Sequence, residues 1–87
     1  MAPDLDDAIR TIVRDQAGLP VDVTKLADGD DLYAAGLTSH ATVTLMLGLE
    51  ERFDVEFPDS LLKRGTFASI AAIRDAVSGL LGAKAAA

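Results

Sequence analysis

The sequence has no cysteine, no tryptophan and a single histidine. Without cysteine there is no disulfide bond, no thiolate metal site and no cysteine nucleophile, and the redox compartment stays open. One histidine, His40, argues against a metal site built from histidines. Chemistry that needs a thiol is therefore beyond the side chains of this sequence.

Long hydrophobic runs are also missing. No run approaches the roughly 20 apolar residues that span a bilayer. The first residues, MAPDLDD, lack the basic start and apolar core of a signal peptide. We therefore expect a cytoplasmic protein that does not bind membranes.

Positive charge is in short supply. Eight lysines and arginines stand against fourteen aspartates and glutamates, the net charge is −6, and most of the excess lies in residues 1–44. An acidic surface repels phosphate backbones, so we do not expect nucleic-acid binding. Basic surfaces of partner proteins are the natural counterpart of such a domain.

The sequence does contain clear helical periodicity. Apolar residues make up 49% of its 87 residues, enough for one small domain. In residues 4–17, apolar side chains recur at the spacing of one helix face. Pro3 precedes this stretch, Asp4, Asp6 and Asp7 load its first turn, and Gly18 is a natural stop. These features predict a first helix.

Residues 18–37 show no sustained period and are punctuated by proline and glycine. A connection of this length needs anchors if the domain is compact. We expect its larger apolar side chains to reach the core, namely Leu19, Val21, Val23, Leu26, Leu32, Tyr33 and Leu37.

A second helix is predicted from Ser39 to about Phe53, with either Ser39 or Thr38 as its N-cap residue. The helical spacing places several apolar residues on one arc, which we expect to face the core. That arc contains Val43, Met46, Leu47 and Glu50, and Leu45 and Leu49 lie beside it.

Two further helices are predicted in the last third of the chain. A short helix is expected at roughly residues 59–63, opened by Pro58 and ended by Gly65. Thr66 is then expected to cap a last helix over residues 67–81, where apolar residues again recur at helical spacing.

The elements together predict an all-α fold, a small four-helix bundle with three long helices, one short helix and a long loop between the first two. We expect residues 1–87 to form a single domain with its core in about residues 4–81. Gly82 should stop the last helix, and residues 82–87 should form a frayed tail. We expect a monomer.

Ser39 is the candidate functional residue. A serine at a helix start is most often only a cap. Here, however, it follows a long loop, and the unpaired N–H groups of a helix N-terminus favour a phosphate group. A serine nucleophile would need a base and an orienting group. His40, its sequence neighbour, would point about 100° away on a helix, so we expect His40 to be solvent-exposed and the chain not to be an enzyme.

The acidic clusters have simpler interpretations than a metal site. Asp28, Asp30 and Asp31 resemble part of a calcium loop but lack its full spacing and its closing glutamate, so a turn is preferred. The acidic residues around Glu50 and Glu51 are interpreted as a solvated face first and a docking surface second.

The order of these pieces resembles the acyl and peptidyl carrier proteins, four-helix domains that carry 4′-phosphopantetheine on a serine. The matching segments are DLYAAGL (31–37) before Ser39, LEERFDVEFPD (49–59) after it, and TFASIA (66–71) at the entry to the last helix. Each segment alone is weak, but their order and spacing are specific. The resemblance covers residues 5–81.

The resemblance implies that a phosphopantetheinyl transferase moves the arm from coenzyme A to the Ser39 hydroxyl. The arm would supply the thiol that the chain lacks and would hold cargo as a thioester. Its other expected partners are an acyl- or aminoacyl-activating ligase and a downstream acyltransferase. The implied recognition face comprises Asp30, Asp31, Thr38, His40, Glu50 and Glu51.

The chain departs from the family pattern at the site itself, where Thr38-Ser39-His40 replaces the usual Asp-Ser-Leu. The lost aspartate bears on partner identity more than on modification, because Thr38 can still cap the helix. The variant motif and the segment FDVEFPD (53–59) are similar to small discrete carriers loaded with an amino acid. A discrete carrier outside primary fatty-acid synthesis is favoured, with acyl and aminoacyl cargo both open. The alternative is an unmodified interaction module in which Ser39 is only a cap.

Overall fold

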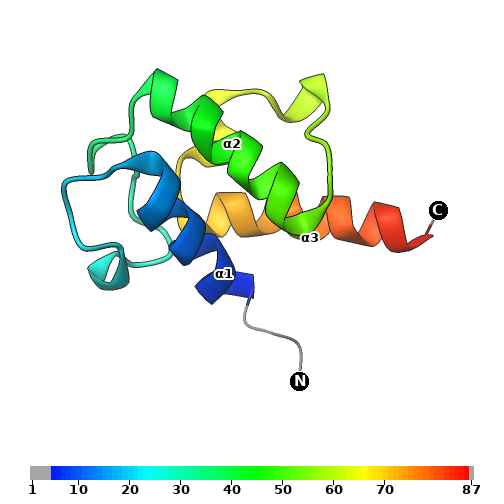
Figure 1. Cartoon of the computed structure of the whole chain (residues 1–87), viewed down its shortest axis with the longest axis horizontal. Coiled ribbons are helices and arrows are strands. Elements are labelled where there is room, and N and C mark those ends of the chain that lie inside the picture. The colour runs from blue at the N-terminus through cyan, green and yellow to red at the C-terminus, as the bar shows by residue number, and fades with distance from the viewer. Residues whose placement is uncertain (1–4, 87) are drawn as a thin grey trace.

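The computed structural model describes residues 5–86, and all regular secondary structure in that range is helical (Figure 1). The three α-helices are α1 (Leu5–Ile12), α2 (Ser39–Phe53) and α3 (Ile70–Ala86). Four short helical turns lie in the connections: η1 (Val13–Ala17), η2 (Val23–Lys25), η3 (Asp59–Leu61) and η4 (Arg64–Phe67). The predicted all-α fold is confirmed, with three α-helices and short turns in place of four helices.

The first predicted helix is present but changes its winding near the end. α1 passes into η1, a turn of π-helix, and the chain leaves the helix at Gly18, which has a left-handed backbone with φ of 62°. Asp6 and Asp7 lie in the first turn, as predicted. Pro3 and Asp4 lie outside the described residues.

The core lies between the three α-helices and the loop that follows α1. In Figure 1, α1 and α2 slant in the same direction and α3 runs at an angle to both, and each of the three helices contacts the other two. The largest fully buried side chains come from all of these parts: Ile9, Val13, Leu32, Leu45, Leu49, Ile70, Ile73 and Val77. The apolar stripes predicted for the first and last helices are therefore core.

The prediction for α2 was wrong about which side faces the core. Leu45 and Leu49 are fully buried, whereas Val43 and Leu47 are each 54% exposed. α2 carries apolar residues on almost every side, so helical spacing alone does not define its inner face. Gly48 contributes to the choice, because a Cβ there would lie 3.2 Å from the Ile12 side chain, and its absence lets α1 approach.

The long loop is anchored to the helices, as its length required. Most of the predicted anchors are buried or partly buried: Leu19, Val23, Leu26, Leu32, Tyr33 and Leu37. Val21 is the exception, since it is 42% exposed. Backbone bonds reinforce this packing. The Leu32 N–H donates to the Ala68 carbonyl at 2.7 Å and the Ala71 N–H donates to the Asp28 carbonyl at 2.9 Å.

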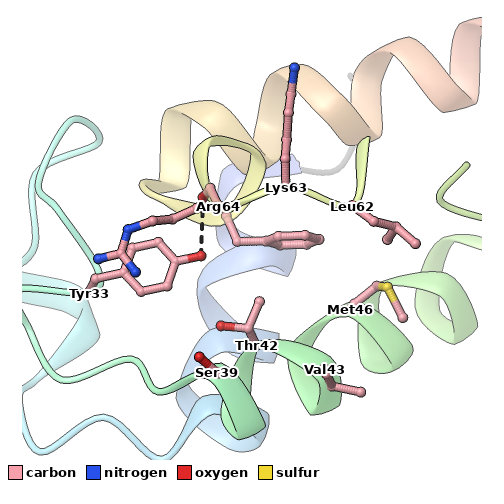
Figure 2. Close-up of a pocket in the computed structure, with 9 residues that line it drawn as sticks. Tyr33, Ser39, Thr42, Val43, Met46, Leu62, Lys63 and Arg64 are labelled. Carbon is pink, nitrogen blue, oxygen red and sulfur yellow. Dashed lines mark hydrogen bonds between the residues drawn. The ribbon is translucent and has the colours of Figure 1, made fainter. Parts of the chain in front are cut away.

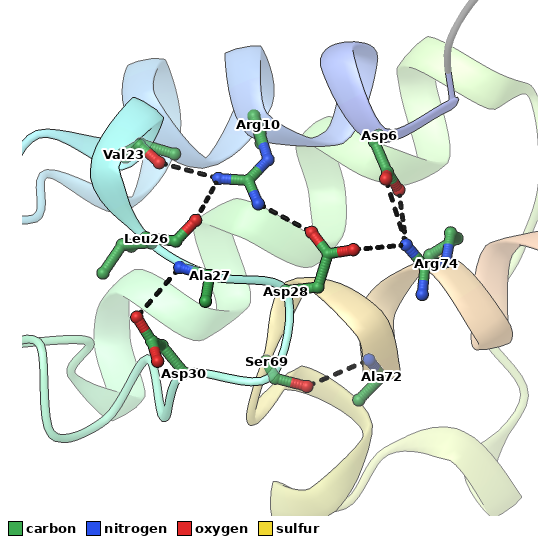
Figure 3. A network of polar contacts seen from close by, with 10 residues as sticks. All are labelled: Asp6, Arg10, Val23, Leu26, Ala27, Asp28, Asp30, Ser69, Ala72 and Arg74. Carbon is green, nitrogen blue, oxygen red and sulfur yellow. Dashed lines mark hydrogen bonds and ion pairs between the residues drawn. The ribbon is translucent and has the colours of Figure 1, made fainter.

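A set of paired charges, here called the polar clamp, fixes the loop from the other side (Figure 3). It consists of Asp6, Arg10, Asp28 and Arg74. Arg10 donates to the carbonyls of Val23 and Leu26 at 2.8 Å each and to the Asp28 carboxylate at 2.7 Å. Arg74 joins Asp28 at 3.1 Å to Asp6 at 2.9 Å. The clamp therefore ties α1, the loop and α3 together.

The short helix predicted at 59–63 is reduced to the single turn η3. So few residues close i to i+3 bonds more easily than an α-helical turn. Pro58 stands immediately before this turn, while Gly65 lies inside η4 and ends no helix. Together, η3 and η4 form an irregular segment that faces α2.

The last helix begins and ends later than predicted. Thr66 is buried within η4, and the capping residue is Ser69, whose Oγ accepts the Ala72 N–H at 3.0 Å. α3 continues through Gly82 to Ala86, so the predicted stop at Gly82 was wrong. None of the helices in residues 5–86 is long and apolar enough to cross a membrane.

Candidate functional site

Ser39 is the first residue of α2, but it is not the residue that caps this helix. Thr38 has the extended backbone of an N-cap, and its Oγ1 accepts the Ala41 N–H at 3.0 Å. The Thr38 carbonyl also accepts the Thr42 N–H at 2.9 Å. Ser39 is exposed, and its hydroxyl makes no hydrogen bond to any other residue that the structure describes. The hydroxyl is therefore available for chemistry.

The turn before the helix places Ser39 at the surface. Leu32 and Leu37 are both buried, and the Leu37 N–H donates to the Leu32 carbonyl at 2.9 Å. Gly36, between them, has φ of 118°, and a Cβ there would lie 2.7 Å from the Pro20 ring. Only glycine fits this backbone and this contact without strain. The chain thus leaves the core at Leu37 in a fixed direction.

A groove of about 370 Å³, here called the serine groove, opens beside Ser39. One wall is the outer side of α2, and the other is the segment at residues 62–67 together with Tyr33 (Figure 2). The lining residues are mostly apolar: Tyr33, Ser39, Thr42, Val43, Met46, Leu62, Lys63, Arg64 and Phe67. Phe67 is buried and packs on Phe57 with ring centroids 5.4 Å apart, so the floor belongs to the core.

At the Tyr33 end of the groove, a tyrosine and an arginine hold each other in place. The Arg64 guanidinium lies over the Tyr33 ring, 3.8 Å from its centroid, and the Tyr33 hydroxyl donates to the Arg64 carbonyl at 3.1 Å. Figure 2 shows this pair next to Ser39. A guanidinium on an aromatic face is stabilised by the ring's negative face.

The site fits a phosphate-linked group on Ser39. A free hydroxyl stands at a helix N-terminus, where N–H groups and the helix dipole favour a phosphate. Arg64 brings positive charge to the groove, whereas the Lys63 amine points away from Ser39 (Figure 2), and no acidic side chain among the described residues lines the groove. A groove with an apolar wall and a basic rim can accommodate an anionic group followed by a carbon-rich chain.

The other residues of the predicted recognition face are spread over several parts of the surface. His40 is exposed in the first turn of α2, as predicted. Asp30 accepts the Ala27 N–H at 2.9 Å, and Asp31 accepts the Tyr33 N–H at 2.9 Å. Glu51 lies with Arg52 in a second, smaller depression towards the end of η1.

Glu50 serves the fold directly. Its carboxylate accepts the Phe57 N–H at 2.8 Å and so holds the turn after α2. In the same turn Asp54 has φ of 54°, and Lys84 donates to its carboxylate at 2.6 Å. The hydrogen bond from Lys84 lowers the pKa of Asp54 below its usual value. This turn is thus closed by side chains from both α2 and α3.

The aspartates that resemble a calcium loop are engaged within the chain. Asp28 belongs to the polar clamp, and Asp30 and Asp31 each accept a backbone N–H of the turn. Over residues 5–86, no group of three or more metal-ligating side chains comes together. These contacts support the turn interpretation.

Sequence reasoning singled out Ser39, whose role stays a prediction, but missed the groove. Leu62, Lys63 and Arg64 lie more than twenty positions after Ser39, and no local pattern connects them to it. Two signals pointed there weakly: adjacent basic residues in an acidic chain, and apolar residues on the outer side of α2. The second was interpreted as core.

Comparisons with known proteins agree with this geometry. Residues 7–77 match the family described as phosphopantetheine attachment site. The chain is 54% identical over 83 residues to the aminoacyl carrier protein of Agrobacterium fabrum, which covers 95% of this chain and 100% of that protein.

The chain is also similar to solved structures. One is a carrier protein from Agrobacterium tumefaciens in complex with an engineered Bradyrhizobium japonicum glycine:[carrier protein] ligase and ATP, with a TM-score of 0.84 and 55% identity over 86% of this chain and 97% of that one. Another is a solution structure from Agrobacterium tumefaciens, with a TM-score of 0.73 and 55% identity over 94% of this chain and 99% of that one.

Proposed function

The chain belongs to the phosphopantetheine-dependent carrier proteins, and from this premise we propose that Ser39 is the residue that bears the arm. The observation that supports this assignment most strongly is the division of roles between two neighbouring hydroxyls. Thr38 caps α2, and the exposed Ser39 hydroxyl bonds to no other residue within 5–86, so modification breaks no structural bond there. The same contact argues against the alternative in which Ser39 is only a cap.

The carrier function follows from the family, and the cofactor is 4′-phosphopantetheine. When bound, this group supplies the thiol that holds the acyl or aminoacyl cargo as a thioester. In the proposed attachment, the Ser39 oxygen forms a bond to the phosphorus of coenzyme A that carries pantetheine. The pyrophosphate bond breaks, the adenosine portion leaves with its phosphates, and the hydroxyl proton is released. The chain's own part is to hold Ser39 at an exposed and fixed point.

We further propose that the chain catalyses no reaction itself. Ser39 lacks the base and orienting group of a serine nucleophile, because the only histidine is its sequence neighbour and is solvent-exposed. A separate phosphopantetheinyl transferase would attach the arm, and a downstream acyltransferase would remove the cargo. The cytoplasmic location and the monomeric state stay predictions of the sequence.

The proposed loading partner is an amino-acid-activating ligase. A ligase bound to a carrier protein is shown in one of the similar structures, and that ligase acts with glycine by its printed name. At 55% identity over most of the chain, the same class of ligase is the best candidate partner here. We therefore propose an aminoacyl cargo, with glycine as the first to test.

The proposed docking surface is the outer side of α2 beside Ser39. Val43 and Leu47 are exposed there, and such apolar residues on a surface mark contact sites for partners. His40 and Glu51 are exposed along the same helix and remain in the proposal, together with Asp30, Asp31 and Thr38 from the preceding loop. Glu50 is expected to contribute less, since its carboxylate already accepts the Phe57 N–H.

Intact mass spectrometry tests the attachment site. The protein is incubated with coenzyme A and a broad-specificity phosphopantetheinyl transferase, alongside Ser39→Ala and Ser78→Ala. Ser78 is the matched control, because it is also an exposed helical serine. We expect one phosphopantetheine on the wild type and on Ser78→Ala, and none on Ser39→Ala. Modification of Ser39→Ala would refute the assignment.

Loading is tested on the modified protein with the glycine-specific ligase, ATP and glycine. We expect a further mass gain of one glycyl group that is removed by hydroxylamine, a nucleophile that cleaves thioesters. Unmodified protein is the control and should gain nothing. Loading with short acyl groups by an acyl ligase, and not with any amino acid, would replace the aminoacyl proposal by the acyl one.

A further inference from the structure

The serine groove has a charge distribution opposite to that of the whole protein. The chain carries a net charge of −6, yet two of its eight basic residues, Lys63 and Arg64, line the groove and no acidic side chain of the described residues does. Within residues 5–86 neither cation has a carboxylate within ion-pair distance. Four other basic residues do have one: Arg10, Arg14, Arg74 and Lys84.

Arg64 is held in a position that leaves its binding edge open. Its guanidinium plane lies over the Tyr33 ring, and its backbone carbonyl is fixed by the Tyr33 hydroxyl. Stacking uses the face of the guanidinium, while its N–H groups point outward in the plane and stay free to donate. A guanidinium held this way loses less side-chain freedom when it binds two oxygens of one ligand.

Ser39 lines the same groove as these two cations. A group esterified to Ser39 through phosphorus carries one negative charge on two non-bridging oxygens, and these match the paired N–H donors of an arginine. The α2 N-terminus adds favourable partial charge at the same point. The wall beyond is apolar, formed by Met46, Leu62 and Phe67.

We propose that Arg64 binds the phosphodiester of the arm on Ser39 and thereby lays the arm into the serine groove between deliveries. Arg64 is in this role a positioning residue. The inference rests on the proposed attachment to Ser39. Because Arg64 is exposed, the bound state weakens with salt, and a partner that offers its own contacts draws the arm out.

The test uses the modified protein, with modification at Ser39 verified by intact mass. Phosphorus-31 NMR reports the phosphodiester directly, and the same protein unfolded in urea gives the reference signal. We expect the native signal to be displaced from this reference, and to lose most of the displacement in Arg64→Gln. Arg64→Lys should retain part of it. Added NaCl should shrink the displacement in the wild type and have little effect in Arg64→Gln.

Arg52→Gln is the matched control. Arg52 is also an exposed arginine beside an aromatic ring, 5.4 Å from the Phe53 centroid, but it lies in the other depression. We expect its phosphorus signal to equal that of the wild type. As a second readout, backbone amide signals of residues 62–67 should differ between the unmodified and modified wild type, and much less so in Arg64→Gln.

The outcomes separate the two proposals. A protein that gains no phosphopantetheine at Ser39 would overturn both. A protein that is modified at Ser39 but shows the same phosphorus displacement and salt response in Arg64→Gln as in the wild type overturns only the role of Arg64. An unchanged phosphorus signal combined with weaker ligase binding by Arg64→Gln would likewise overturn it, and would assign Arg64 to partner docking.

Discussion

The polar clamp and the serine groove use the same kinds of side chain for different ends. In the clamp, Arg10 and Arg74 are joined to Asp28, and Arg10 also takes two backbone carbonyls (Figure 3). In the groove, Arg64 lies on an aromatic ring with its N–H edge open (Figure 2). The residue type does not distinguish a structural cation from a binding one; its partners do.

The same comparison distinguishes the part of the molecule that fixes the fold, the polar clamp, from the part that is exposed for binding, the serine groove. The clamp and the packed loop fix where α2 begins, while the groove leaves polar groups and apolar surface exposed. A site held by a rigid frame can be exposed without being loose. The following predictions alter the joint between the two regions, the clamp or the start of α2, and they run from the largest expected effect on stability to the smallest.

The largest effect is expected at the joint between the two regions. Gly36→Ala places a Cβ 2.7 Å from the Pro20 ring at a backbone φ of 118°. Strain and overpacking together should lower the free energy of unfolding by about 3 kcal/mol. Urea denaturation checks this. Gly29→Ala is the control, because a Cβ there meets nothing within 4 Å, and an equal loss in both variants would contradict the explanation.

The next effect is expected within the clamp. Arg10→Ala removes the donor to the Val23 and Leu26 carbonyls, so the free energy of unfolding should fall by about 2 kcal/mol. Arg14→Ala, on the next turn, removes only a surface pair with its neighbour Asp15 and should change stability little. Thermal and urea unfolding of the two variants side by side measure the difference. Similar losses would mean that the clamp does not hold the loop.

A smaller effect separates the two hydroxyls at the start of α2. Thr38→Ala removes the cap to the Ala41 N–H and should cost about 1 kcal/mol of stability. Ser39→Ala should cost close to nothing, although under the proposed assignment it should abolish attachment of the arm. Thr38→Ser should restore the stability, since a serine hydroxyl also caps. Greater destabilisation by Ser39→Ala than by Thr38→Ala would show that the capping assignment is reversed.

The smallest effect is the pH dependence of the stability that the clamp contributes. Hydrogen bonds from Arg10, and then from Arg74, lower the pKa of Asp28 below its usual value. A lowered pKa in the folded state means that Asp28 contributes stability above the ordinary aspartate pKa of about 3.9, and that this contribution is lost as pH falls further. Asp28→Asn should lose less stability than the wild type between about pH 5 and pH 2. Arg64→Gln should behave as the wild type, since the groove has no acidic residue.

The fold was largely predictable from the sequence because its main signals are local. Ile9, Ile73 and Val77 recur at helical spacing and are all fully buried, and Gly18 stops η1 as predicted. The errors arose where a local pattern has more than one solution. α2 is apolar on most sides, and Gly48 helps to decide which side α1 covers. The spacing of apolar residues along α2 does not by itself show which side is buried.

The sequence points to the proposed attachment residue but not to its surroundings. The loop, the helix start and the family resemblance all converge on Ser39. The groove depends on how residues 62–67 fold back towards α2, which involves contacts far apart in sequence. The clamp was missed for the same reason, because Asp6 and Arg74 meet only in the folded chain.

The placement of the cap on Thr38 has a thermodynamic consequence for the two forms of the protein. A modification changes folding stability only if it adds or removes interactions in the native state relative to the unfolded state. Esterifying Ser39 removes no intrachain bond of the described residues, so the unmodified and the modified chain both keep the Thr38 cap. Native-state contacts of the attached group with the α2 N-terminus or Arg64 would then add stability to the modified form, while the unmodified form gives up none of its own. A cell could thus keep a reserve of unmodified carrier that is already folded before the arm is attached.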